Sequence, residues 1–366
     1  MSREHHPGIR LSAIHIESRS VQLAAAASGI GAVAGAIVFW QGSVPLFGPW
    51  SIGTVAAITG SILGAGGFVF AYLRALGPLP PRKQDRLARA RRALDTTALT
   101  VNHVAIWLIL SLGTFLLLDD AFRGLRVDTL TAAVLVAVAT GISAYFMQAS
   151  GNTINSLRIS TLLSIFIASG VLASMITAPD PAWWKRNFSD LGTMAGFSGF
   201  AFNFTLIVTG GLILTLSDYV MVDVRKWARS RPDYNARKVS VIGWGLVGEG
   251  AFLAGVGIFP VNRFHAIHNT VAISLVVLFV AMVFALPNLL PGFPATFVTL
   301  GYAFLGAVVV VTLLYFPIGY YNLTALELVA SAVILGWIII FIRTAAALNP
   351  TETTSPASDA MVSNTA

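Results

Sequence analysis

Runs of about 20 apolar residues recur along the whole chain, and each could cross a ~30 Å hydrocarbon core as a helix. Outer-membrane strands alternate apolar and polar residues, so these continuous runs exclude a barrel. The sequence therefore predicts an all-α fold, a polytopic transmembrane helical bundle of about ten spans. The predicted spans lie near residues 21–41, 51–75, 98–118, 129–149, 158–178, 194–220, 240–260, 268–288, 294–316 and 321–347.

Composition excludes a soluble domain and several kinds of chemistry. Hydrophobic residues make up 56% of the 366 residues and charged residues 11%, with a mean hydropathy of +0.77. A soluble fold of this length could not bury so much apolar surface. The chain has no cysteine, which excludes disulfides, thiolate metal ligands and thiol nucleophiles. Any chemistry must use oxygen and imidazole groups, and the sequence identifies no cofactor.

Basic residues are distributed unevenly between the two sides of the predicted bundle. Eighteen of the 23 Lys and Arg fall on the side of the N-terminus. By the positive-inside rule, both termini and the loops 77–96 and 222–239 are expected in the cytoplasm, with 179–193 and 261–267 outside. We therefore expect a multi-pass inner-membrane protein. The sequence pI of 10.0 reflects this topology, so the expected partners are membrane lipids, with anionic headgroups at the cytoplasmic basic loops, and not nucleic acid.

The pattern divides the chain into four regions. A cytoplasmic segment, 1–20, shows no cleavable signal and precedes a four-span region, 21–157. A six-span core covers 158–347, and the Thr- and Ser-rich tail 348–366 is expected to be disordered.

Two glycine pairs stand in the first two predicted spans. Gly31 and Gly35, like Gly60 and Gly64, are four residues apart, a spacing that favours close helix packing. Packing within the bundle is the main interpretation, and a dedicated dimer interface is the alternative. The oligomeric state does not follow from the sequence.

One carboxylate lies at the depth of the bilayer core. Glu249 stands between Gly248 and Gly250 in the apolar run 240–260, where an ionisable group is costly and usually functional. It is eleven residues from Pro260, or ~16 Å, and Asn203 has a similar expected depth, so the two could meet. Glu249 is either a functional carboxylate in a cavity or a protonated structural residue bonded to another span.

The outer loops carry the other polar candidates. Ser189 or Asp190 is a natural N-cap for the sixth span. His265 and His268, which follow Arg263, are three residues apart, so on a helix they share a face and could ligate one metal or shuttle protons. Ordinary interfacial histidines are the alternative. If Asp190 approached both, the group would resemble a hydrolytic metal site.

Several short motifs stand in the last six predicted spans, and they are Ser189-Asp-Leu-Gly192, Asn203, Gly210, Gly257-Ile-Phe-Pro260, His268, Glu327 and Trp337. With them, residues 158–347 resemble a bacterial membrane family catalogued as Domain of Unknown Function 998. That family is similar to the eukaryotic group of the DRAM autophagy modulators and a GPI-lipid remodelling factor. Where the family tends to have an acidic residue after the proline, this chain has Val261-Asn-Arg263. The resemblance implies lipid-linked membrane biology and no established reaction.

Two classes of function follow. The favoured one is a protein that binds, transports or organises a lipid or small amphiphile through a polar pocket in the six-span core. Its expected ligand contacts are Ser189, Asp190, Asn203, Glu249, Arg263, His268 and Glu327. The alternative is an integral-membrane lipid hydrolase in which Asp190, His265 and His268 act around a metal or as acid and base, with Glu249 as a further catalytic candidate. We expect Asp190, His268 and Glu327 to line one outward-facing pocket.

Overall fold

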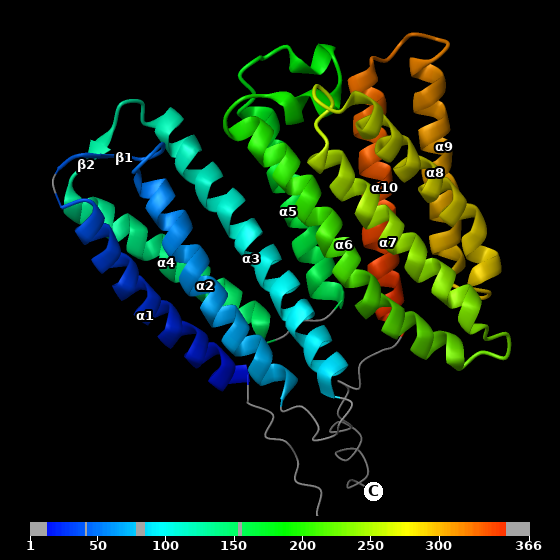
Figure 1. Cartoon of the computed structure of the whole chain (residues 1–366), viewed down its shortest axis with the longest axis horizontal. Helices are drawn as coiled ribbons and strands as arrows, with labels where there is room; N and C mark the ends of the chain where they lie inside the picture. The colour runs from blue at the N-terminus through cyan, green and yellow to red at the C-terminus, as the bar shows by residue number, and fades with distance from the viewer. Residues whose placement is uncertain (1–12, 41, 78–84, 153–155, 349–366) are drawn as a thin grey trace, which may run out of the picture. The chain divides into compact units, whose positions relative to one another are not determined.

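The computed structural model describes residues 13–40, 42–77, 85–152 and 156–348 (Figure 1). In this part of the chain, ten helices are long and apolar enough to span a membrane, which confirms the predicted all-α, polytopic fold. They are α1 (Ala13–Val38), α2 (Ile52–Leu76), α3 (Asp85–Ala121), α4 (Thr129–Gly151), α5 (Ser156–Ile176), α6 (Phe197–Arg229), α7 (Ala236–Ile258), α8 (His265–Leu289), α9 (Ala295–Tyr315) and α10 (Leu323–Ala347). The tail 349–366, expected to be disordered, lies outside the described residues.

Several helices extend into the charged segments that the sequence predicts as loops. The first helix begins within the segment 1–20, and α3 begins within the predicted loop 77–96. Only 230–235 of the predicted loop 222–239 lies between α6 and α7. Arg, Lys, Ala and Leu are good helix formers, and helical hydrogen bonds continue into water. Hydropathy therefore marks the membrane-spanning part of each helix and misses its polar ends.

The packing divides the chain into two compact units. The first comprises α1–α4 with residues 165–179 and 194–208. The second comprises 156–164, 180–193 and the chain from Thr209 through α10. Both α5 and α6 therefore contribute residues to each unit.

In the first unit, α4 packs closely on α1 and α2. A Cβ at Gly35 would lie 2.9 Å from the Cα of Ala133, and one at Gly64 would lie 2.6 Å from the hydroxyl of Ser143. Both glycines thus face a helix of the same chain, as the packing interpretation predicts. In lipid, where helices gain little from hydrophobic burial, such close contacts supply much of the attraction between helices.

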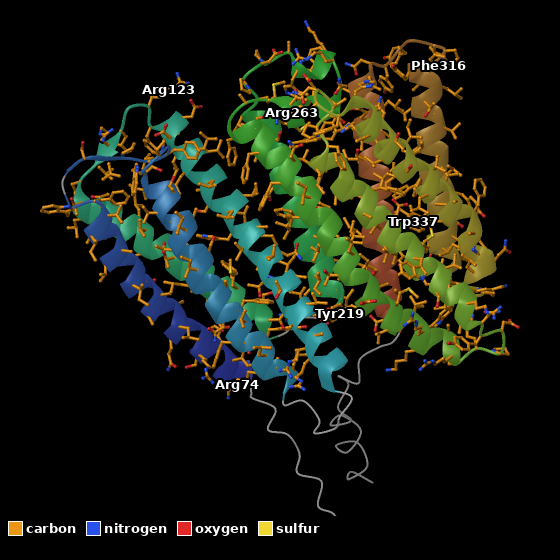
Figure 2. The ribbon with its side chains drawn as sticks, in the orientation of Figure 1. Arg74, Arg123, Tyr219, Arg263, Phe316 and Trp337 are labelled. Carbon is orange, nitrogen blue, oxygen red and sulfur yellow. The ribbon has the colours of Figure 1, made fainter. Side chains whose placement is uncertain are left out.

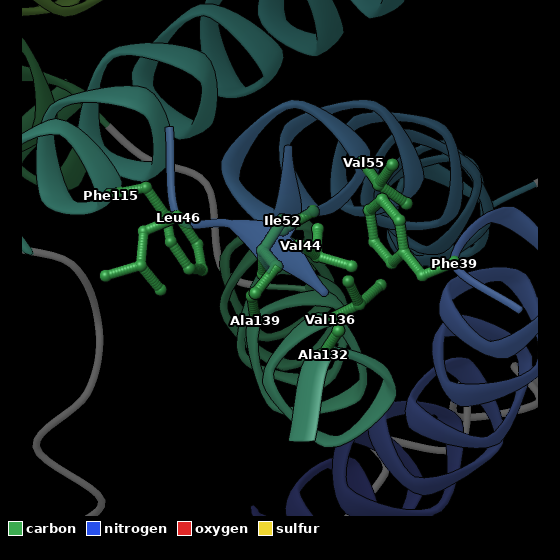
Figure 3. Close-up of a cluster of buried hydrophobic side chains, with 10 residues drawn as sticks. Phe39, Val44, Leu46, Ile52, Val55, Phe115, Ala132, Val136 and Ala139 are labelled. Carbon is green, nitrogen blue, oxygen red and sulfur yellow. The ribbon is translucent and has the colours of Figure 1, made fainter. Parts of the chain in front are cut away.

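A hydrophobic cluster closes one end of the first unit (Figure 3). It lies where two short strands that the sequence does not predict, β1 (Val44–Pro45) and β2 (Arg126–Val127), pair antiparallel. The buried side chains include Phe39, Val44, Leu46, Ile52, Val55, Phe115, Ala132, Val136 and Ala139. Two-residue strands carry too little pattern to be predicted.

In the second unit, α7 contacts α6 on one side and α8 on the other. A Cβ at Gly250 would lie 2.7 Å from the carbonyl oxygen of Gly210, so the α6 and α7 backbones approach closely. On the α8 side, Gly245 and Gly248 face the side chains of Met282 and Leu278. The glycines of α7 therefore set its distance to two neighbouring helices.

Aromatic rings fill the space between α8, α9 and α10. The ring of Trp337 lies 5.7 Å from that of Phe279 and 5.5 Å from that of Phe297. It also stacks on Phe341 at 5.7 Å. Trp337, the largest fully buried side chain, lies in the middle of α10 (Figure 2).

Candidate functional site

A short segment before α6 packs against the start of α10 and places polar groups there. It contains two 3-10 helices, η1 (Trp183–Lys185) and η2 (Phe188–Thr193). The Asn322 carboxamide accepts from the Ala325 N–H at 3.1 Å, which caps α10, and donates to the Trp184 carbonyl at 2.7 Å. One residue therefore starts α10 and ties η1 to it.

Next to this cap lies a group that we call the η2–α10 polar cluster, formed by Ser189, His268 and Glu327. The Ser189 backbone N–H donates to Oε2 of Glu327 at 3.0 Å. The Glu327 carboxylate is also within electrostatic reach of His268. The structure thus brings together three residues that the sequence predicts as ligand contacts.

The position of His268 explains why the Gly257-Ile-Phe-Pro260 motif precedes it in the sequence. Its Nδ1 lies 2.7 Å from the Phe259 carbonyl oxygen, and a carbonyl only accepts, so we assign the ring proton to Nδ1. Pro260 disfavours helical backbone at Phe259, and α7 ends at Ile258. The Gly257-Ile-Phe-Pro260 turn therefore presents the carbonyl that orients the His268 ring.

Asp190 belongs to an ion-pair network of the same segment and not to a helix cap. The Arg186 guanidinium donates to Asp180 at 2.8 Å and also to Asp190, while the Thr193 hydroxyl donates to Asp190 Oδ1 at 3.0 Å. The N–H of Ala182, and then Arg186, hold the pKa of Asp180 below its usual range. The bonds to Asp190 and Asp180 raise the pKa of the Arg186 guanidinium.

The predicted N-cap role of Ser189 or Asp190 is wrong. Both residues lie in η2, and α6 begins only at Phe197. The chain turns between η2 and α6 at Gly196, whose φ of +74° favours glycine. The Gly196 carbonyl accepts a hydrogen bond from the Phe200 N–H. The oxygens of Asp190 are occupied by Arg186 and Thr193, so they do not cap α6.

The three hydrolase candidates do not converge. His265 is exposed, with Nε2 3.3 Å from the Asn269 side chain, whereas His268 is buried. Asp190 is bound to Arg186. No group of three or more His, Asp or Glu residues that could hold a metal occurs in the described ranges. Arg263 is exposed in the turn before α8 (Figure 2).

Glu249 is buried in the interior of the second unit. Its side chain is 0% exposed, and neither carboxylate oxygen has a hydrogen-bond partner among the described residues. Glu249 is the residue before Gly250, and Gly250 faces Gly210 of α6. Thr209 is the residue before Gly210, so along the helix axes Thr209 and Glu249 lie within about 3 Å of the same level. The Thr209 hydroxyl is also buried and has no partner in the described part of the chain.

Asn203 is half-buried in α6 and belongs to the first unit. It lies six residues after the start of α6, or ~9 Å. Glu249 lies nine residues before the end of α7, or ~14 Å. These two distances from the helix ends differ because α6 starts later than expected, and the equal depth of the two residues in the membrane stays a prediction. The contact between Asn203 and Glu249 stays a prediction.

Two buried polar groups of the same segments, near η2 and at the start of α10, are absent from the candidates predicted by sequence. Asn187 Oδ1 and Thr324 Oγ1 are buried, and neither has a hydrogen-bond partner within the described ranges. Thr324 follows the Asn322 cap and looks in sequence like an ordinary helix start. No pattern in the sequence distinguishes it from a solvated threonine.

Comparison with known proteins links this region to one family. The family model described as "Protein of unknown function (DUF998)" matches residues 160–344. No curated protein and no solved structure matches the chain. The match includes both Glu249 and the η2–α10 polar cluster, and it covers half of the chain. The chain therefore belongs to the DUF998 family of membrane proteins of unknown function.

Proposed function

We propose that the second unit binds a membrane amphiphile and that Glu249 engages its polar group. The observation that carries this proposal is the buried, unpartnered carboxylate of Glu249 among the described residues. An ionised carboxylate in this position would cost several kcal/mol. A protonated one would still leave an acceptor unmatched, at about 1–3 kcal/mol. A partner from outside the chain removes this cost.

The chemistry of the site indicates the class of ligand. An ionised carboxylate only accepts hydrogen bonds, so the complementary group is a hydroxyl or an ammonium. The neighbouring core positions of α7 are apolar, with Leu246 and Leu253 both buried. A small polar group attached to an apolar body, as in a lipid, suits both environments.

We infer that the ligand enters between α7 and α8, where side chains and not backbone face the glycines of α7. Gly245 and Gly248 face the flexible ends of Met282 and Leu278. Unbranched and terminal side-chain atoms move at low cost, whereas Gly250 faces α6 backbone. A ligand therefore enters from the α8 side. The η2–α10 polar cluster, with Ser189, His268 and Glu327, provides further polar contacts in the same unit.

Native mass spectrometry of the purified full-length protein tests the proposal. We expect the wild type to retain a lipid and Glu249→Gln to retain about tenfold less, since the amide keeps the shape but cannot ionise. Asp218→Asn is the matched control, because Asp218 is an exposed carboxylate on the neighbouring α6. Equal retention by Glu249→Gln and Asp218→Asn, or no lipid retained by the wild type, would contradict the proposal.

A further inference from the structure

The first unit contains a polar cavity that lies outside the family match. It has a volume of about 410 Å³ and is formed by the start of α1 and the ends of α2 and α4. We propose that this cavity binds a phosphate group, carried either by an anionic lipid headgroup or by free phosphate. The residues that carry the proposal are Arg19, Phe70, Arg74, Gln148 and Asn152.

Close helix packing brings the three helix ends together. A Cβ at Gly141 of α4 would meet the Ser28 hydroxyl of α1 at 2.0 Å. The Ser143 hydroxyl of α4 donates to the Gly60 carbonyl of α2 at 2.8 Å. A Cβ at Gly151 would lie 2.8 Å from the Phe68 carbonyl oxygen. The walls of the cavity are therefore held by packing along the length of all three helices.

The cavity is positively charged. Arg19 and Arg74 line it, and among the residues that the structure describes no acidic side chain does. Neither arginine forms a salt bridge with the described residues. Glu17, the nearest acid in sequence, accepts a hydrogen bond from the Tyr145 hydroxyl. Two guanidinium groups that face one cavity without a counter-charge are typical of an anion site.

The orientation of Arg19 suits phosphate recognition. Its guanidinium carbon lies 4.8 Å from the centroid of the Phe70 ring. A cation–π contact uses the face of the guanidinium and leaves its N–H edge free. That edge matches two phosphate oxygens in a bidentate arrangement. Phe70 therefore holds Arg19 without consuming its donors.

Capping of helix ends does not account for the arginines. The carbonyls of Leu73 and Gly77 at the end of α2 accept from Arg92, both at 2.8 Å. At the end of α4, the Asn152 side chain donates to the Gln148 carbonyl at 3.0 Å. Other side chains thus donate hydrogen bonds to these carbonyls, so capping does not explain why Arg74 lines the cavity.

Gln148 is an independent indication of a ligand. Its side chain is 1% exposed, and its Oε1 has no hydrogen-bond partner within the described ranges. Buried amide oxygens are nearly always bonded. A protonated phosphate oxygen or a headgroup hydroxyl would supply the missing donor, next to the positive charge of the two arginines.

The depth of the cavity suits a lipid phosphate. Arg19 lies in the first turn of the candidate span Ile16–Val38, and Arg74 lies in the last turn of Ile52–Leu76. Both are therefore at the boundary of the hydrocarbon core, where phospholipid phosphates lie.

Thermal unfolding of the delipidated full-length protein in neutral detergent tests the proposal. The probes are phosphatidic acid, phosphatidylcholine and inorganic phosphate, at constant ionic strength. The variants are Arg19→Gln and Arg74→Gln. The control is Arg123→Gln, whose side chain is 83% exposed at the opposite end of the first unit from Arg74 (Figure 2).

We expect a phosphate probe to raise the melting temperature of the wild type and of Arg123→Gln equally, and its Kd to rise about tenfold in Arg19→Gln and in Arg74→Gln. A response to inorganic phosphate assigns the site to free phosphate. A response to phosphatidic acid alone assigns it to a lipid headgroup. No response to any probe, or equal affinity in all three variants, would overturn the proposal.

Discussion

The backbone N–H of Ser189 donates a hydrogen bond of 3.0 Å to the carboxylate of Glu327, a residue 138 positions later in the chain. This bond fixes η2 against α10 and holds the carboxylate in place near His268. Glu327 is therefore a fold-stabilising residue as well as a predicted ligand contact.

Replacement of Glu327 tests the first of these roles. Glu327→Ala leaves the Ser189 N–H without its acceptor and should destabilise the protein by about 1–3 kcal/mol. Glu327→Gln keeps a carbonyl oxygen in reach and should lose much less. The measurement is thermal unfolding in detergent. An equal loss in the two variants would show that the Ser189 bond does not stabilise this end of the unit.

The two sides of α7 should respond differently to added methyl groups. Gly250→Ala would place Cβ 2.7 Å from the Gly210 carbonyl oxygen, and α6 backbone cannot move aside easily. We expect a loss of about 1–3 kcal/mol. Gly248→Ala meets only Cδ2 of Leu278, which can rotate, and should be tolerated better. Thermal unfolding of both variants checks the order, and a larger loss for Gly248→Ala would contradict the α6–α7 packing.

The Asp180 network predicts a pH dependence. The Ala182 N–H and Arg186 lower the folded-state pKa of Asp180, so its stabilisation is present above the ordinary aspartate pKa and is lost as pH falls through the folded value. The melting temperature of the wild type should exceed that of Asp180→Asn at pH 6, by a small margin because the group is exposed. The difference should narrow towards pH 3. A difference in melting temperature that stays constant from pH 6 to pH 3 would show that ionisation of Asp180 does not stabilise the fold.

Single introduced cysteines test the orientation cleanly, since the chain has none. The charge bias predicts that Arg123→Cys and Arg263→Cys react with an impermeant maleimide added to intact cells. Asp233→Cys, in the loop between α6 and α7, should react only after permeabilisation. Labelling of position 233 in intact cells would reverse the predicted topology.

Hydropathy predicts the spans well because membrane burial demands about 20 apolar residues in a row. It predicts their ends poorly, as the charged start of α3 shows. Helix propensity, and not solvent preference, decides how far a helix continues into water. Asp190 does not cap α6 for a different reason, since η2 and the turn at Gly196 come before the helix, which begins at Phe197.

The sequence predicts a site residue only where an ionisable side chain stands inside an apolar membrane span. Glu249 is conspicuous because a carboxylate is rare in a membrane span. Thr324 and Gln148 are not conspicuous, since their buried, unpartnered oxygens depend on neighbours from other helices. The pairing of Ser189 with Glu327 joins residues far apart in sequence, so no local pattern could predict the contact itself.

The lipid-induced change in melting temperature of Glu249→Leu tests the central claim most directly. Because Glu249 has no partner among the described residues, leucine should leave the lipid-stripped protein at least as stable as the wild type. Membrane lipid extract should then raise the melting temperature of the wild type by more than that of Glu249→Leu, because only the wild type keeps the Glu249 carboxylate. An equal rise in both proteins would contradict a ligand-binding role for Glu249.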